Sequence, residues 1–163
     1  MTLLEIFDSN VDIRWKELGW GARGEYTHDD LPFVIELRKI ALPELKGQRV
    51  AEVTFYRADI TSDAAFSTTN QTPAPFAVYA APMSALSSRS ADWDAFYFSA
   101  ERRHGPGDTA EKRSRIYRAL AHRAARRTGM TEYERGSSGR EEFLVSITPP
   151  DGGNWIDRNG GEV

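Results

Sequence analysis

The chain contains no cysteine, only three histidines and no long apolar run, and each of these features argues against a class of function. Without cysteine there is no disulfide, no thiolate metal site and no cysteine nucleophile, a composition that fits a reducing compartment. No window approaches the ~20 consecutive apolar residues of a membrane-spanning helix. The opening MTLLEIFDSNVDIRWKEL lacks the positive leader and apolar core of a secretory signal. We therefore expect a cytoplasmic protein that makes no contact with a membrane.

Recognisable catalytic motifs are also missing. The sequence has no Gly-x-Ser-x-Gly elbow, no Walker loop and no Gly-x-Gly-x-x-Gly. The cluster His28, Asp29 and Asp30 is typical of a solvated turn, and the other two histidines are far away in sequence, so no metal site is predicted. Glu141 and Glu142 are adjacent, and on a strand they point to opposite sides, which excludes them as a general acid and base pair.

The bulk composition is that of one ordinary globular domain. The chain has 163 residues, of which 40% are hydrophobic and 28% charged. We expect a single domain over residues 1–150, with 1–23 as an N-terminal docking segment, and a flexible Gly/Pro-rich tail over 151–163. The net charge is −3, whereas a generic nucleic-acid binder is basic, so any basic function is local.

Hydrophobic periodicity predicts a mixture of strands and helices. Strands are expected within 24–40, 49–60 and 94–100, and a hairpin is expected around Gly-Ser-Ser-Gly between 131 and 147. Helical spacing appears in PFAVYAAPMSALSSRSADW (75–93), where Pro82 would kink the helix or start a shorter one, and again over 109–128, where Gly129 provides the stop. The order predicts an α/β or α+β fold: one mixed, mostly antiparallel sheet, with strand 94–100 central and two helices covering its faces.

The helix at 109–128 carries an unusual concentration of positive charge. Between residues 102 and 127 there are nine Lys and Arg residues against two acids. One stripe, away from the apolar face, is formed by Arg115, Arg118, His122 and Arg126. The pattern fits an ordinary solvated face, and it also fits an anion site for an acidic protein or a phosphate-bearing ligand. Nucleic acid is less favoured because no aromatic stacking residues are interleaved on this helix.

Several short motifs resemble the GNAT family of N-acetyltransferases. DAFYFSA (94–100) looks like a core strand of the family, RIY (115–117) like its Leu-Tyr pair, and TGM (128–130) like the end of its last helix. The combination of YFSA with SRIYRAL (114–120), together with LLEIFDS and AEVTFYR, is similar to small GNAT-like proteins of tailed bacteriophages. The likeness covers most of the chain. It implies a GNAT-like sheet flanked by helices.

The resemblance also implies roles for particular residues. The family binds acyl-CoA in a V-shaped gap between two splayed central strands. Tyr117 matches the tyrosine that protonates the departing thiolate, and Glu52 is the expected base for an amine. The aligned pyrophosphate loop is QTPAPF, in which the matching positions are Gln71, Thr72 and Ala74. Ala74 and Phe76 replace its glycines, and two prolines remove N–H donors that would cradle phosphate.

Two functions follow from these expectations. The first is a phage-type GNAT-fold protein that acts by binding through its basic helix, as a virion component or an effector directed at the host, with no cofactor. The second is an active N-acyltransferase that uses acetyl-CoA, with Tyr117 as acid and Glu52 as base. The damaged loop favours binding.

Overall fold

The computed structural model describes residues 12–28, 30–59, 89–101, 110–137 and 139–158. The chain divides into two compact units, one formed by Met1–Arg38 and Val53–Arg89 and the other by Lys39–Glu52 and Ser90–Val163. Residues 75–88 of the stretch expected to be helical lie outside the described residues, and Ser90–Asp92 at its end form a 3-10 turn. Within the described part of the chain, no helix is both long enough and apolar enough to cross a membrane.

The strands belong to one eight-stranded sheet in the order β1-β2-β3-β4-β5-β7-β6-β8. β4 and β5 run parallel, and the other registered pairs of described residues run antiparallel, which confirms the mixed, mostly antiparallel sheet. β5 has a neighbour on each side, as expected for strand 94–100. The elements are β1 Arg14–Leu18, β2 Gly21–His28, β3 Leu31–Ile40, the 3-10 turn η1 Pro43–Leu45, β4 Val50–Arg57, the 3-10 turn η3 Ser90–Asp92, β5 Ala95–Glu101, α5 Ala110–Thr128, β6 Thr131–Ser137, β7 Arg140–Ser146 and β8 Ile156–Asp157.

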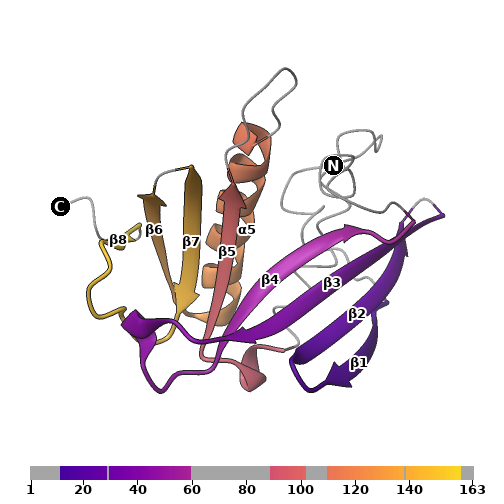
Figure 1. The fold of residues 1–163 in the computed structure, drawn as a ribbon, viewed down its shortest axis with the longest axis horizontal. Coiled ribbons are helices and arrows are strands. Elements are labelled where there is room, and N and C mark those ends of the chain that lie inside the picture. The colour runs from indigo at the N-terminus through magenta and orange to yellow at the C-terminus, as the bar shows by residue number, and fades with distance from the viewer. Residues whose placement is uncertain (1–11, 29, 60–88, 102–109, 138, 159–163) are drawn as a thin grey trace. The chain divides into compact units, whose positions relative to one another are not determined.

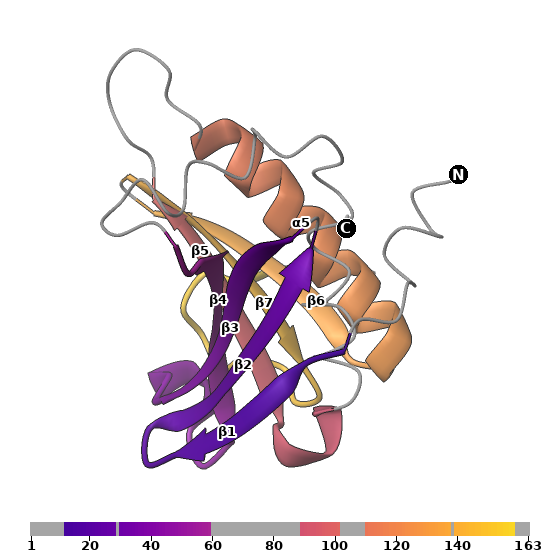
Figure 2. The same cartoon turned by 90° about the vertical axis from the view of Figure 1, so that its right-hand side faces the viewer.

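In the first unit, β1, β2 and β3 form a meander (Figure 2). The segment 24–40 contributes to two strands, with a tight turn between His28 and Leu31 where Asp30 has a φ of 64°. Residues 14–23 of the expected docking segment form β1, the turn at residues 19 and 20, and the start of β2. Apolar side chains alternate with polar ones along the strands, and the buried members include Ala22, Tyr26, Phe33, Ile35 and Leu37.

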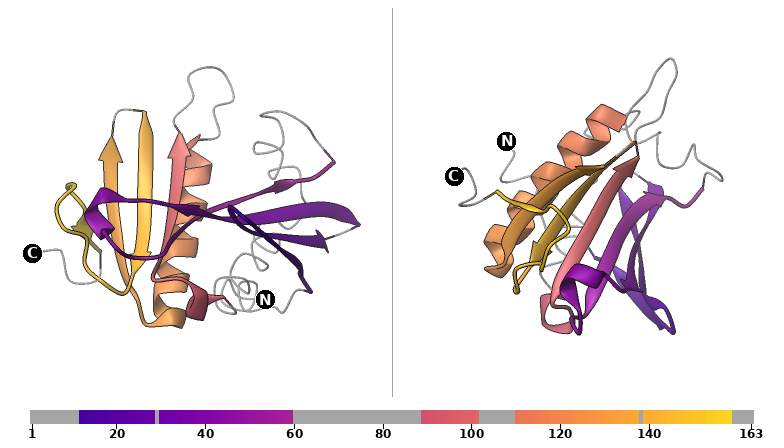
Figure 3. Two further views of the ribbon diagram at one scale, coloured as in Figure 1. Left: turned by 60° about the horizontal axis from the view of Figure 1, so that its bottom comes forward. Right: turned by 60° about the vertical axis from the view of Figure 1, so that its left-hand side comes forward.

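In the second unit, α5 covers one face of β5, β7 and β6 (Figure 1). Phe98 on that face has its ring centroid 6.0 Å from the ring of Tyr117. The opposite face is covered by the connection between β3 and β4, which contains η1 (Figure 3). A second cluster forms there from Leu45, Val50, Ala95, Tyr97, Tyr133 and Leu144. The sheet of this unit is therefore covered on both faces, by one helix and by one extended connection.

The C-terminal residues up to 158 are tied to this unit. The N–H of Asp151 donates to the carbonyl of Glu44 at 2.8 Å, and the N–H of Arg158 donates to the carbonyl of Glu132 at 2.9 Å. β8 pairs with β6 between these two anchors. Most of the segment expected as a mobile tail thus contributes an edge strand and two backbone contacts.

Candidate functional site

Helix α5 forms because its sequence is rich in Ala and Arg, which are strong helix formers. Leu120, Ala121 and Ala124 are fully buried, so the helix meets the sheet through small side chains. Its end matches the expectation: Gly129 has a φ of 77°, and its N–H donates to the carbonyl of Ala125 at 2.9 Å. The first turns lie near the carboxyl end of β5, and the last turns lie beside the start of β6 (Figure 1).

Arg118, an expected partner-binding residue, is engaged within the protein. Its Nε and Nη2 donate to Oε1 of Glu134 at 3.0 and 2.8 Å, and Glu141 lies 3.6 Å away. The guanidinium also sits over the ring of Phe143, 5.6 Å from its centroid. The hydrogen bonds to Glu134 raise the pKa of Arg118. The Arg118 side chain is therefore held by contacts within the protein, while 41% of its surface stays exposed to solvent.

His122 is engaged in the same way. Its Nδ1 lies 3.0 Å from Oε1 of Glu132, whose residue is only 2% exposed. Glu132, Glu134 and Glu141 lie on the sheet face that α5 covers, because their register partners Val145, Phe143 and Ala100 do. We call these three glutamates the acidic strip. It supplies negative charge directly beneath part of the basic helix.

The other two residues of the predicted stripe differ from these. Arg126 is exposed, and no hydrogen bond or ion pair to it is found among the described residues. Arg115 lies on α5, but its side chain is outside the described set. The structure therefore pairs Arg118 and His122 with the acidic strip and leaves Arg126 available.

The expected acid and base do not come together. Tyr117 is 5% exposed and packs against Phe98, on the face covered by α5. Glu52 is half-buried and pairs in register with Tyr97, whose side chain belongs to the cluster on the opposite face. Since register partners point to the same side of a sheet, the sheet separates the side chains of Tyr117 and Glu52. The expected loop residues Gln71, Thr72 and Ala74 lie outside the described residues.

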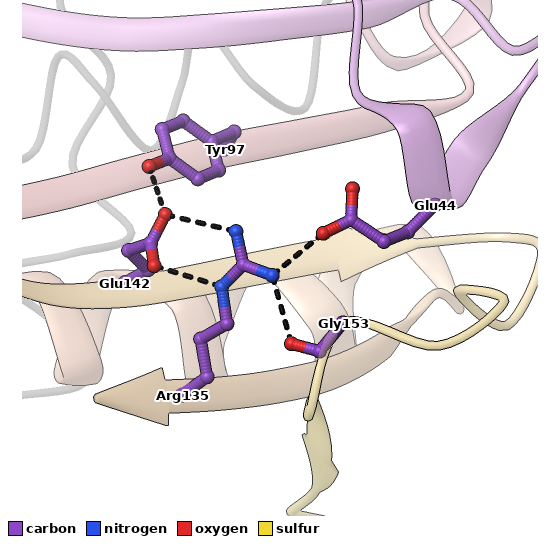
Figure 4. A network of polar contacts seen from close by, with 5 residues as sticks. All are labelled: Glu44, Tyr97, Arg135, Glu142 and Gly153. Atoms are coloured by element: carbon purple, nitrogen blue, oxygen red, sulfur yellow. Dashed lines mark hydrogen bonds and ion pairs between the residues drawn. The ribbon is translucent and has the colours of Figure 1, made fainter. Parts of the chain in front are cut away.

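A buried polar network that the sequence did not reveal lies on the face opposite α5 (Figure 4). Arg135 Nε donates to Oε2 of Glu142 at 2.7 Å, while its Nη1 donates to Oε1 of Glu44 at 2.6 Å and to the carbonyl of Gly153 at 2.8 Å. The hydroxyl of Tyr97 donates to Oε1 of Glu142 at 2.5 Å. One guanidinium thus joins β6, β7, η1 and the segment that precedes β8.

The charge states in this network follow from its geometry. Burial opposes ionisation of Glu142, but hydrogen bonds from Arg135 and Tyr97 outweigh it and lower the pKa of the carboxyl. Glu44 behaves alike, with burial opposed by Arg135 and a net lowered pKa. Burial first, and then Glu142, raise the pKa of Tyr97 to about 12. The network is thus a compact set of opposite charges in which neither the two carboxyl groups nor the tyrosine has its pKa shifted toward neutral pH.

Comparison with profiles of known protein families, with curated protein sequences and with solved structures found no match. Within the described part of the chain, no group of three or more acidic or histidine side chains is placed to hold a metal ion.

Proposed function

We propose that this chain is a GNAT-like protein that acts by binding an acidic protein through the exposed C-terminal half of α5. The observation that carries the proposal is the composition of that half. Residues 118–128 include four arginines and one histidine and no carboxylate, and Arg126 has no partner among the described residues. Such a surface attracts an acidic partner, more strongly at low salt.

The GNAT-like part of the proposal is supported by the order of elements. β5, α5 and β6 follow one another as strand, helix and strand, as the resemblance implies. The parallel pair β4 and β5 lies in the interior of an otherwise antiparallel arrangement, and its two strands are the candidates for the central pair of the family.

An acidic protein is favoured over a single phosphate by the position of the cations. They lie in the last turns of α5, where the helix dipole presents its negative end and free carbonyls rather than free N–H groups. A compact anion bound there gains nothing from the backbone. An acidic protein surface, in contrast, meets several guanidinium groups at once.

Binding is favoured over acyl transfer because Tyr117 and Glu52 lie on opposite faces of the sheet. A proton donor and a base for one substrate must both reach it, within about 3 Å of the atoms they serve. A buried Tyr117 against Phe98 is accounted for by packing. We therefore propose no catalytic role for either residue.

Charge reversal on α5 tests the proposal. We expect the protein to be retained on immobilised poly-L-glutamate at low salt and Arg126→Glu to elute at distinctly lower salt. Lys46→Glu is the matched control, since Lys46 is also exposed, has no partner among the described residues, and changes the net charge equally. Equal losses in both variants would contradict the assignment to α5.

A melting experiment tests the alternative function. A ligand present at about 100 times its Kd stabilises a protein by ~2.7 kcal/mol. We expect millimolar acetyl-CoA to leave the melting temperature unchanged. A clear rise would instead support the acyltransferase function, and Tyr117→Phe would then be assayed for acyl transfer.

A further inference from the structure

The strand β1 forms one edge of the sheet, and it is bordered by a charged groove. Among the described strands, β1 is bonded to β2 alone, so no described strand pairs with the backbone N–H and C=O groups on its other side. A groove of about 480 Å³ lies against β1 and β2, lined by Arg14, Trp15, Lys16, Leu18, Arg23 and Glu25. These residues belong to the first unit and are independent of α5.

The lining has an excess of positive charge. Glu25 is its one acidic residue, and it lies 3.7 Å from Arg14 and 3.8 Å from Arg23. Lys16 lies directly opposite Arg23 in the register and makes no hydrogen bond or ion pair among the described residues. The Arg14 side chain is 80% exposed. A ligand that carries carboxylates would find both cations accessible.

The other face of β1 is less polar. Trp15 lies there with the guanidinium of Arg89 4.5 Å from its ring centroid, and Arg89 also pairs with Glu17. Residues of a neighbouring strand alternate between two faces. A strand added next to β1 would therefore place every second side chain over Arg14 and Lys16, and the intervening ones beside Trp15.

We propose that the β1 edge binds an extended acidic segment of a partner protein by strand addition, with carboxylates at alternate positions over Arg14 and Lys16 and apolar residues between them. Main-chain hydrogen bonds provide the affinity in this mode, and alternate side chains provide the specificity. The assignment goes beyond the proposed role of α5 and does not depend on it.

The charge of Lys16 disfavours the simplest competing occupant. A second copy paired antiparallel through β1, centred on residue 16, would set Lys16 directly against Lys16, and like charges directly opposite are destabilising. Lysine on an edge strand also discourages apolar strands. Lys16 therefore disfavours a second copy of the chain and apolar strands, and it favours an acidic segment, which makes this edge selective.

The probe is a labelled peptide about seven residues long with alternating Glu and Val, a length typical of a strand. We expect it to bind the full chain at low salt, measured by fluorescence anisotropy, and to weaken as ionic strength rises. Lys16→Glu and Arg14→Glu should each weaken binding about fivefold, in line with partly exposed ion pairs. Arg126→Glu and Lys46→Glu should bind as the unchanged protein does, which separates this proposal from the one for α5.

N-methylated versions of the peptide test strand addition without altering the protein. In a bound strand, alternate amides point toward β1, so methylation of one alternate set should abolish binding while methylation of the other set leaves it intact. Equal effects of both sets, or equal binding by Lys16→Glu, would overturn the proposal. A concentration-dependent dimer in sedimentation that is lost in Lys16→Glu would also overturn it, since the occupant would then be a second copy.

Discussion

Replacing Arg135 by Met is expected to destabilise the second unit strongly, because it leaves a buried carboxylate without its partner. Glu142 is 6% exposed and is held by Arg135 and by the Tyr97 hydroxyl. Methionine keeps much of the aliphatic stem that packs near Trp155, over whose ring the guanidinium sits at 4.2 Å. The substitution therefore removes mainly charge and hydrogen bonds rather than volume.

The expected loss of unfolding free energy is about 3 kcal/mol at pH 7. Breaking a buried ion pair by removing one partner typically costs about 3–5 kcal/mol. The lower end applies because the Arg135 side chain is 21% exposed, which allows water to reach part of the network. For a chain of this size, such a loss corresponds to a fall in Tm of roughly 6–12 °C.

The loss should depend on pH with a definite sign. Arg135 lowers the pKa of Glu142 in the folded state below its unfolded value. The stabilisation is thus present above the unfolded pKa, about 4.3, and is lost as pH falls through the folded pKa. In Arg135→Met, loss of the Arg135 cation leaves burial less opposed and raises the pKa of Glu142 relative to the unchanged protein, so this variant takes up its proton at higher pH. The difference in stability between the two proteins should shrink from pH 7 to pH 4.5.

Urea unfolding at both pH values measures these differences. Glu142→Leu combined with Arg135→Met should be more stable than Arg135→Met alone, because the double variant no longer buries the Glu142 carboxylate without its cation. A stability difference that stays the same at pH 7 and pH 4.5 would refute the electrostatic explanation. Strict additivity of the effects of the two substitutions on the free energy of unfolding would also refute the electrostatic explanation.

Three further substitutions test local packing, a helix end and an ion pair. In Gly24→Ala the new Cβ would lie 2.6 Å from the Ile13 side chain, which should lower the free energy of unfolding by about 1–3 kcal/mol, measured with urea. Gly136→Ala, with open space around the new Cβ, is the control and should change that free energy by no more than about 0.5 kcal/mol. Gly129→Ala places a Cβ at a φ of 77° and should lower the urea midpoint by an amount equivalent to about 1 kcal/mol, whereas no change would contradict the helix end described. Hydrogen bonds from Arg49 lower the pKa of Asp94, so Asp94→Asn should destabilise by about 1 kcal/mol at neutral pH. The difference should shrink once the pH falls below the unfolded pKa of about 3.9 and disappear only below the lowered folded pKa, and a constant difference would exclude the charge as its source.

Elements with strong local signals could be predicted from the sequence. The helix expected over 109–128 spans Ala110–Thr128. Its apolar periodicity identifies the helix, and Gly129 marks its end. The hairpin around residues 137–140 follows from turn residues between two alternating segments. The turn between His28 and Leu31 was assigned correctly from its acidic residues, although the strands on either side of it were read as a single strand signal.

The buried network could not be predicted, because its members are distant in sequence. Arg135 and Glu142 form a cross-strand pair that the hairpin register alone would suggest. Glu44 is 91 residues from Arg135 and reaches it only because the connection between β3 and β4 covers the sheet face opposite α5. No periodicity encodes that contact. Tyr97 likewise looked like one more apolar residue of a central strand.

The example of α5 shows that counting charged residues along one helix does not give the net charge of the surface that a partner meets. Nine cations against two acids in residues 102–127 made the helix look uniformly basic. Glu132 and Glu134 alternate on β6, however, and that alternation places both carboxylates on the face toward the helix, where they meet His122 and Arg118. An acidic partner must therefore compete with the acidic strip near the middle of α5, whereas near its end it meets Arg126 without competition. Charge reversal at Arg126 should for that reason weaken binding to polyglutamate more than reversal at Arg118 does.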